Sequence, residues 1–303
     1  MKNERAIAIL QTIGILVLMS LGTVLIKLAL TDVEPFTFAW VSVTIGMVAL
    51  ALYTFGIRRE PIPRNLPTKV WLTILVIGFL NFFVARLTTT LSLDLLEATT
   101  NTYLVNFVGF VTMGMSIFIL KESPTLFQVL GAAVALAGLR IFFPGALSDA
   151  QLRGVFLILV GIMGIAYTNN ITRKLLMTTQ QLSSLIISTI ALLFGGGLLL
   201  LAGLITDWPP HVGSLANVGT LFYTGLVMIA FSMSVWNYIL RTLRSYEASI
   251  LGASTVIWTA LLAVPILGET LTINKIIGIA LMLIGLALVQ VRRGQLRLPG
   301  WRK

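Results

Sequence analysis

The chain contains no cysteine and only one histidine in 303 residues. The absence of cysteine excludes disulfide bonds and thiol chemistry. The single histidine, His211, does not make a metal site, because such a site needs several ligands. We also find no phosphate-binding loop, nucleophile elbow or zinc-binding motif. The sequence therefore predicts no enzyme activity, no metal and no cofactor.

Charged residues are scarce: they make up 11% of the chain, whereas hydrophobic residues make up 57%. The mean hydropathy is +0.97, far above the balance of a soluble protein. The longest hydrophilic stretches are Arg58–Lys69 and the tail from Arg292, so we expect no soluble domain. The apolar runs are continuous rather than alternating, which excludes the strands of a membrane barrel. The chain is predicted to be an all-α membrane protein.

Apolar runs near the length of a membrane-spanning helix recur along the chain. A helix needs about 20 apolar residues to cross the hydrocarbon core, and ten runs approach that length. They are Ala6–Leu30, Phe36–Ile57, Val70–Thr90, Ala98–Leu120, Leu126–Phe143, Val155–Ile171, Leu182–Ile205, Val218–Leu240, Ala248–Leu267 and Ile273–Val291. The first run is too long for the core of a cleaved signal peptide and nine more follow it, so we expect it to remain as a span.

The second half of the chain repeats the first. A shift of 147 residues lays Glu122, Gly131 and Gly138 on Glu269, Gly278 and Gly285. Each half holds five spans, and this odd number predicts that the second half enters the membrane in the opposite sense. Inverted repeats of this kind are typical of transporters. We therefore predict ten transmembrane helices in two inverted five-helix repeats, residues 1–147 and 148–294, followed by a basic tail, residues 295–303.

Basic residues indicate how the spans are oriented. If the first span leaves the cytoplasm, the inner loops and termini hold most of the 21 basic residues, and the outer segments hold Arg140, Arg153 and Lys275. This distribution predicts a multi-pass protein of the inner (plasma) membrane with both termini cytoplasmic. The net charge of +10 is then a topology signal that also favours anionic lipid. No nucleic-acid partner is expected, because the charges are spread over short loops.

The turns after the fourth and ninth runs share a motif. Leu120-Lys121-Glu122-Ser123 and Leu267-Gly268-Glu269-Thr270 are each followed by two glycines. Together with the two five-span halves, this pattern resembles the EamA-type members of the drug/metabolite transporter superfamily over nearly the whole chain. The resemblance implies a carrier that exports amino acids or related metabolites. Members of the family often have a proline in the middle of spans 4 and 9, where this chain has Gly109 and Val256, so the mid-helix bend is not carried over.

Glu122 and Glu269 are predicted to cap the helix that follows each of them, because a carboxylate there can accept from free amides and favour the positive helix end. The paired glycines and the run Gly195–Gly197 are predicted to be close-packing positions between helices.

Polar and aromatic side chains within the spans indicate where a solute could lie, because unpaired amides are costly in lipid. The candidates for a central cavity between the halves are Lys27, Asn81, Tyr103, Asn106, Tyr167, Asn170, Trp236, Tyr238, Ser254 and Trp258. Lys27 belongs to a polar stripe with Ser20 and Thr23, although a lysine so near a helix end can also extend its ammonium group to the interface. For the other candidates, hydrogen bonding between packed helices is the alternative.

Arg86 lies in the outer third of the third run, and Asp94 and Glu97 follow it at the connection to the fourth. A structural ion pair is the favoured interpretation, because a lone charge is costly in the membrane. A gate or a site for a substrate carboxylate is the alternative. No carboxylate lies in the middle of a span. This disfavours an acidic proton relay and leaves facilitated exchange or ion coupling open, with the proton as one candidate ion.

The sequence thus predicts a secondary transporter that moves a small organic solute by alternating access through a cavity between the repeats. Drug efflux and uptake of choline or another quaternary amine are alternatives, since aromatic side chains suit cation–π contacts. A membrane scaffold or lipid-binding protein that transports nothing is an alternative of another class. Both a monomer and a homodimer are compatible with the sequence.

Overall fold

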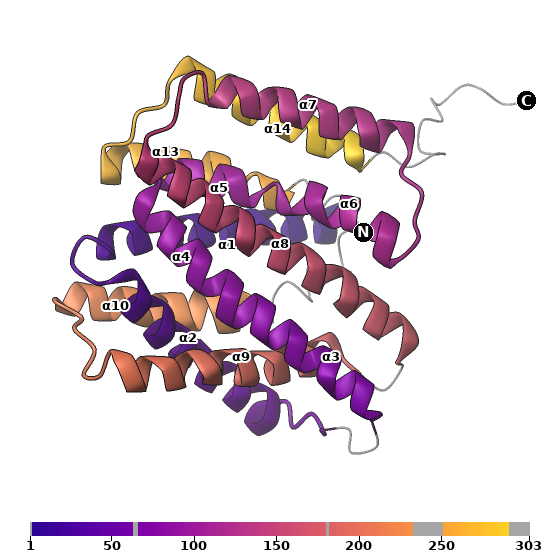
Figure 1. Cartoon of the computed structure of the whole chain (residues 1–303), viewed down its shortest axis with the longest axis vertical. Helices are drawn as coiled ribbons and strands as arrows, with labels where there is room; N and C mark the ends of the chain where they lie inside the picture. Colours follow the sequence, from indigo (N-terminus) through magenta and orange to yellow (C-terminus); the bar gives the residue numbers. More distant parts are fainter. Residues whose placement is uncertain (1, 63–65, 180–181, 233–250, 291–303) are drawn as a thin grey trace, which may run out of the picture.

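The computed structural model describes residues 2–62, 66–179, 182–232 and 251–290, and every element within these ranges is helical (Figure 1). Within these ranges, six helices are long and apolar enough to cross a membrane, and four shorter apolar helices accompany them. The predicted all-α membrane architecture is confirmed at this level, and each predicted apolar run coincides at least in part with a helix. Trp236, Tyr238 and the basic tail lie outside the described residues.

The first half of the chain forms a series of helices, several of which continue directly into one another. The elements are α1 (Lys2–Ala29), α2 (Pro35–Ala51), η1 (Leu52–Ile57), α3 (Thr68–Gly78), η2 (Phe79–Ala85), α4 (Arg86–Leu95), α5 (Ala98–Val105), α6 (Val108–Ile119) and α7 (Leu126–Phe142). The η segments are π-helical, with the wider turn that often occurs at functional sites. Helices α3, η2 and α4 form one apolar run from residue 68 to residue 95.

The second half follows the same order. Its described elements are α8 (Asp149–Thr178), α9 (Ser184–Thr206), α10 (Leu215–Tyr223), η3 (Thr224–Phe231), α13 (Thr255–Leu267) and α14 (Ile273–Val289). The most extensive packing runs between the halves: α7 lies along α14, α4 along α8, α2 along α9 and α1 along α13. Figure 1 shows the α7–α14 pair side by side at one edge of the bundle. The two repeats are therefore interleaved in one structure.

Glycines set the close approach of α7 to α14. A Cβ added at Gly131 would lie 2.4 Å from the carbonyl oxygen of Gly285, and one added at Gly285 would lie 2.5 Å from that of Gly131. Gly138 and Gly278 face each other in the same way, at 2.9 Å in both directions. Since the repeat shift maps Gly131 onto Gly278 and Gly138 onto Gly285, the two contacts exchange equivalent residues, as a twofold relation requires. The helices run antiparallel at this contact.

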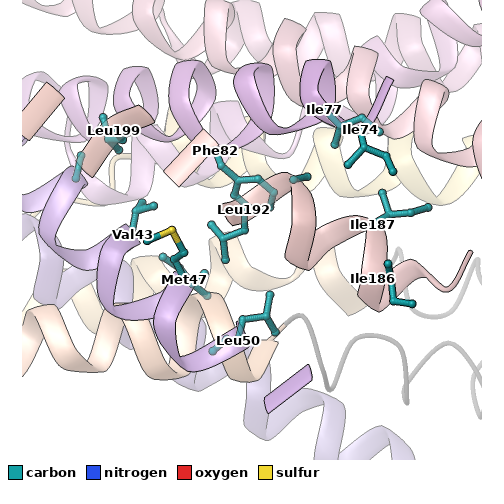
Figure 2. Packing of buried hydrophobic residues seen from close by; sticks show 14 of the residues in the cluster. Val43, Met47, Leu50, Ile74, Ile77, Phe82, Ile186, Ile187, Leu192 and Leu199 are labelled. Carbon is teal, nitrogen blue, oxygen red and sulfur yellow. The ribbon is translucent and has the colours of Figure 1, made fainter. Parts of the chain in front are cut away.

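A second tight contact joins the halves where α9 packs on α2, α3 and η2. Figure 2 shows its buried apolar side chains, which include Val43, Met47, Ile74, Ile77, Phe82, Leu192 and Leu199. A Cβ at Gly195 would lie 2.0 Å from the carbonyl oxygen of Gly78, whereas a Cβ at Gly197 would have no neighbour within 4 Å. Within the run Gly195–Gly197, close packing thus holds for the first two glycines and not for the third.

We expect Gly195→Ala to lower the stability of the folded protein by about 1–3 kcal/mol, because α9 must move away from α3 to admit a methyl group. Gly197→Ala is the matched control in the same helix. It should be neutral or slightly stabilising, since alanine is favoured over glycine in a helix by about 1 kcal/mol. Thermal unfolding of both variants in the same detergent measures the difference. Equal losses would contradict the packing described for Gly195.

Candidate functional site

Two helices are interrupted at equivalent places in the two repeats. In the first repeat, Asn106 and Phe107 form a turn between α5 and α6. In the second, Ser254 forms a turn directly before α13. The repeat shift maps Phe107 onto Ser254, and their backbone angles agree: φ −69° and ψ −10° at Phe107, φ −65° and ψ −9° at Ser254. The interruption is therefore a property of both repeats.

The hydrogen bonds at the two turns agree as well. The amide of Phe107 donates to the carbonyl of Leu104 at 2.9 Å, and the amide of Ser254 donates to that of Leu251 at 2.9 Å. Both bonds span three residues, as in a 3₁₀ turn, instead of the four of an α-helix. Neither turn contains proline, and both lie two residues before Gly109 and Val256. These helices are therefore interrupted although neither turn contains proline.

Three of the predicted cavity residues lie at these interruptions. The amide nitrogen of Asn106 donates to the carbonyl of Thr102 at 2.9 Å. The indole of Trp258 donates to the hydroxyl of Ser254 at 3.2 Å, and that hydroxyl donates to the carbonyl of Leu251 at 2.6 Å. These side chains thus support the irregular backbone through local hydrogen bonds.

The π-helical segments η2 and η3 also occupy equivalent places. The repeat shift carries residues 79–85 onto 226–232, and η3 spans Thr224–Phe231. Irregular backbone at membrane depth is tolerated only where protein covers it or where it lines a cavity. Four irregular segments thus lie at places related by the repeat, one each in spans 3, 4, 8 and 9.

A cavity of about 550 Å³ lies between the repeats. One wall comes from α3 and η2 of the first repeat, and the other comes from α8 and α9 of the second. Its lining residues are Ile77, Asn81, Phe82, Thr168, Asn169, Thr172, Arg173, Leu176, Met177, Ser184, Ile187 and Ser188. The hydroxyl and amide groups in this set offer hydrogen bonds to a small polar solute, and the apolar groups can cover its hydrocarbon part.

The two neighbouring asparagines of α8 have different surroundings. Asn169 is exposed and lines the cavity. Asn170 is buried, and its side-chain nitrogen donates to the carbonyls of Thr112 at 2.9 Å and Ala166 at 3.0 Å. Asn170 therefore joins α8 to α6, whereas Asn169 faces the space between the repeats. Of the predicted cavity residues, Asn81 also lines this cavity.

The predicted tyrosines lie elsewhere. Tyr103 is fully buried, and its ring stacks on Phe142 with the ring centroids 4.0 Å apart. Its hydroxyl lies 3.4 Å from the carbonyl oxygen of Gly278, so Tyr103 packs α5 against α7 and α14. Tyr167 is 38% exposed and lines a separate groove of about 710 Å³ between α3 and α8.

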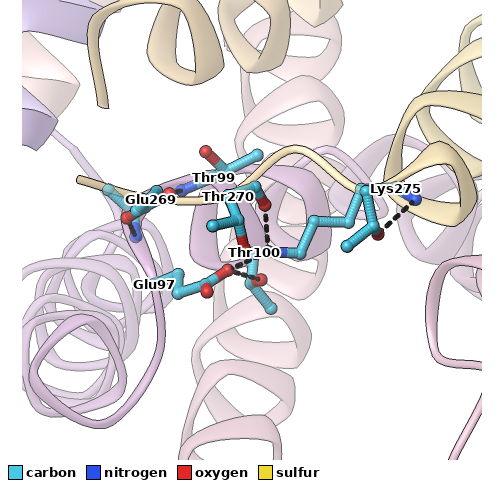
Figure 3. Close-up of polar contacts among 8 residues, drawn as sticks. Glu97, Thr99, Thr100, Glu269, Thr270 and Lys275 are labelled. Atoms are coloured by element: carbon cyan, nitrogen blue, oxygen red, sulfur yellow. Dashed lines mark hydrogen bonds and ion pairs between the residues drawn. The ribbon is translucent and has the colours of Figure 1, made fainter. Parts of the chain in front are cut away.

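A polar cluster joins the repeats at one end of the bundle. We call Glu97, Ala98, Thr99, Glu269, Thr270 and Lys275 the Glu269 cluster (Figure 3). The carboxylate of Glu269 accepts hydrogen bonds from the backbone amides of Ala98 and Thr99, the latter at 3.1 Å. Because these amides open α5, the charge also lies at the positive end of a helix. A residue of the second repeat thus caps a helix of the first.

Lysines extend this cluster. Lys275 at the start of α14 pairs with Glu97 and also donates to the carbonyl of Thr270 at 2.8 Å. Lys27, near the end of α1, donates to the backbone carbonyl of Asp94 at 2.7 Å. Lys27 also borders a groove of about 540 Å³ beside Glu269. These contacts attach the connection between α4 and α5 to α1 and to α14.

The family model for EamA-like transporters matches the chain twice, over residues 6–143 and 152–291. The chain belongs to the EamA-like transporter family. This places it in the drug/metabolite transporter superfamily, with one copy of the family unit in each half. The family consists of membrane transporters, so the identification makes this chain a membrane transporter at that level.

Solved structures agree with the fold of this EamA-like protein. In all, 28 solved chains match it. One of them, described only as the crystal structure of a protein, superposes with a TM-score of 0.64 over 95% of this chain and 96% of its own, at 16% sequence identity. At that identity the likeness concerns the fold alone. No curated protein matches the sequence.

The ion pair favoured for Arg86 does not form in this EamA-like protein. Glu97 pairs with Lys275 instead, and Asp94 is exposed and contributes its backbone carbonyl to Lys27. Both acidic residues lie at least two helical turns beyond Arg86 along the chain. These residues are close in the sequence but far apart in space, because a helix advances about 1.5 Å per residue.

The predicted capping by the two glutamates is also corrected. Helix α7 is capped by Thr125 with Gln128, and α14 is capped by Thr272. Glu122 pairs instead with Arg173 of α8, at 2.8 Å. The glutamates therefore act across the repeats, which no local motif indicates.

Sequence reasoning missed the polar side of α8 that lines the cavity. Thr168, Asn169 and Thr172 follow one another at helical spacing, and this stripe was a usable signal. The choice of Asn170 over its neighbour depended on how α8 is rotated, which the sequence of one helix does not determine.

We expect Glu269→Ala to lower stability by about 1–3 kcal/mol, because it leaves two amides at the start of α5 without their acceptor. The matched control is Glu122→Ala, its equivalent in the first repeat. Its ion pair with Arg173 is exposed, at 44% and 57% of the two side chains, and such pairs contribute about 0–1 kcal/mol. Thermal unfolding in detergent measures both. A loss in Glu122→Ala as large as in Glu269→Ala would refute the assigned cap.

Proposed function

We propose that this EamA-like protein is a secondary transporter that carries a small organic solute, an amino acid or a related metabolite, across the inner membrane. Export is the expected direction. In this proposal ten helices cross the membrane, both termini are cytoplasmic, and the Glu269 cluster faces the outside. The solute passes between the two repeats, which rock against each other to open the pathway to one side at a time.

The observation that carries the proposal is the repetition of helix interruptions at Phe107 and Ser254. Discontinuous helices at the interface of inverted repeats are a common feature of solute sites in transporters. A scaffold protein has no need for irregular backbone at membrane depth, since continuous helices satisfy their own amides. The matching π-helical segments η2 and η3 add the same argument for spans 3 and 8.

The contacts at the two ends of the bundle support a proposal about which side of the pathway is closed. The Glu269 cluster joins α5 of the first repeat to the α13–α14 connection of the second. The cavity lined by Asn81 and Asn169 extends toward the opposite end, where Met177 lies near the end of α8 and Ser184 begins α9. We propose that the outer side is closed by this cluster and that the solute enters from the cytoplasmic side.

Flux in proteoliposomes tests this function. The purified protein is reconstituted, and uptake and counterflow of labelled amino acids and choline are measured with and without a pH gradient. Saturable counterflow of an amino acid supports the proposal, and its response to the gradient identifies proton coupling. Saturable flux of choline alone supports the quaternary-amine alternative. The absence of flux for all solutes, in correctly inserted protein, contradicts the proposed class of substrate.

The neighbouring asparagines of α8 provide matched variants. Asn169→Leu is expected to reduce counterflow at least tenfold and leave the unfolding temperature unchanged, because it removes an amide from the cavity only. Asn170→Leu is expected to lower stability by about 1–3 kcal/mol, because two backbone carbonyls lose their donor. Flux and thermal unfolding are measured on the same preparations. Unchanged flux in Asn169→Leu would remove the cavity from the pathway.

A further inference from the structure

Arg86 is a cation inside the membrane-spanning part of the bundle. It begins α4, directly after η2, in the continuous run from residue 68 to residue 95. Nine residues separate it from one end of this run and eighteen from the other. At about 1.5 Å per residue, these separations correspond to roughly 14 Å and 27 Å. Arg86 therefore lies within the hydrocarbon, in the outer third of this span.

Its guanidinium group has no protein partner among the described residues. The Nε atom is buried and makes no hydrogen bond. Neither Asp94 nor Glu97 neutralises it, since the carboxylate of Glu97 is held by Lys275. Arginine stays protonated in proteins, and buried charges are normally paired. An unpaired charge at this depth is a functional hypothesis by default.

Extension to the interface does not explain Arg86. Lys27, on α1, can extend toward the interface in this way. It lies near its helix end, and its ammonium reaches the carbonyl of Asp94. Arg86 lies seven residues, about two turns, farther from its helix end than Lys27 does, and its Nε is enclosed by protein. The side chain as a whole is half-buried.

The face of α4 that carries Arg86 continues to a contact with α2. Leu93 lies seven residues later, on the same side of the helix, and packs in a cluster with Val24 of α1 and Phe38 of α2. The contact with α8, where Thr88 and Thr89 approach Gly161, adjoins this face, because Thr89 follows Arg86 by three residues. Phe82, four residues before Arg86 and thus on a neighbouring part of the helix surface, lines the cavity between the repeats.

The charge is not part of the duplicated fold. The repeat shift maps Arg86 onto Met233 in the sequence, so the second repeat has an apolar residue at the equivalent position. The glycines that join α7 to α14 and the helix interruptions are present in both repeats. A costly residue that only one repeat carries is better explained by a ligand than by packing.

We propose that Arg86 binds the anionic group, a carboxylate or a phosphate, of the transported solute. The planar guanidinium donates two parallel hydrogen bonds to either group, and the pairing removes the cost of the isolated charge. This inference rests on the proposed function and narrows it: solutes with an acidic group are bound, and quaternary amines such as choline are disfavoured by repulsion.

Matched solutes test the acidic group directly. Wild-type protein is studied with L-phenylalanine, its decarboxylated form phenethylamine, L-leucine, glycerol 3-phosphate and choline. Competition is measured in counterflow, and the same solutes are tested for protection against thermal unfolding. We expect at least one carboxylate or phosphate to compete and protect at a concentration at least tenfold below phenethylamine and choline. If the amines compete as well or better, the inference is overturned while the proposed transport function stands.

Variants connect the preference to Arg86. Arg86→Gln is expected to raise the KM for the acidic solute at least tenfold and to abolish the preference over phenethylamine. Arg86→Lys keeps the positive charge but lacks the planar guanidinium that donates two parallel hydrogen bonds. It should retain part of the preference. Arg153→Gln is the control, since Arg153 is exposed at the start of α8. Its KM should equal that of the wild type.

A merely structural role gives a different result. If Arg86→Gln and Arg86→Lys lower stability but keep the wild-type KM and solute preference, the inference is overturned. If Arg86→Gln does not fold, the comparison of Arg86→Lys with the wild type decides by the same criterion. If no acidic solute is moved or protects the wild-type protein, the inference is likewise overturned, and the choline arm then shows whether transport itself stands.

Discussion

Hydrocarbon offers no hydrogen bonds to a polypeptide backbone, and most of this structure follows from that constraint. Continuous helices satisfy their own amides and carbonyls, so departures from regular helix need shelter from lipid. Here four of the departures lie in spans 3, 4, 8 and 9, at places related by the internal repeat, and a further one, η1, ends span 2. The first amides of a helix are a further source of unpaired groups, and at the start of α5 the carboxylate of Glu269 accepts from two of them.

Close contact between the repeats depends on small side chains. Gly131 with Gly285, and Gly138 with Gly278, bring α7 and α14 together by two equivalent contacts. Gly78 and Gly195 do the same for α3 and α9. Such contacts favour association in lipid through packing alone, since apolar surface gains little by leaving hydrocarbon. They provide a firm frame against which the interrupted helices can be positioned.

The sequence was sufficient for features that depend on composition and on the repeat. The apolar runs, the duplication and the close-packing glycines at 131, 138, 278 and 285 were all predictable, because each is expressed in spacing along the chain. What the sequence did not determine was the rotation of one helix against another. That rotation decides that Asn169 and not Asn170 lines the cavity, and that Glu269 caps α5 and not α14.

Differences between the repeats matter for function as much as their similarity. Glu269 caps a helix, whereas its equivalent Glu122 forms an exposed ion pair. Arg86 is a half-buried cation whose Nε has no partner among the described residues, whereas its equivalent in the sequence is Met233. A duplicated frame with unequal polar residues can close one side with one set of contacts and bind a solute with another. The account therefore requires the Glu269 cluster to open and close during transport.

That requirement is tested most directly by the accessibility of residue 99. Thr99 is fully buried, its hydroxyl has no partner in the described part of the chain, and its amide donates to Glu269. Because the chain has no cysteine, Thr99→Cys provides a single reactive thiol. A membrane-impermeant maleimide is added outside vesicles at rest and during counterflow. The account predicts slow labelling at rest and faster labelling during counterflow. Sustained counterflow with no change in labelling would contradict alternating access through this cluster.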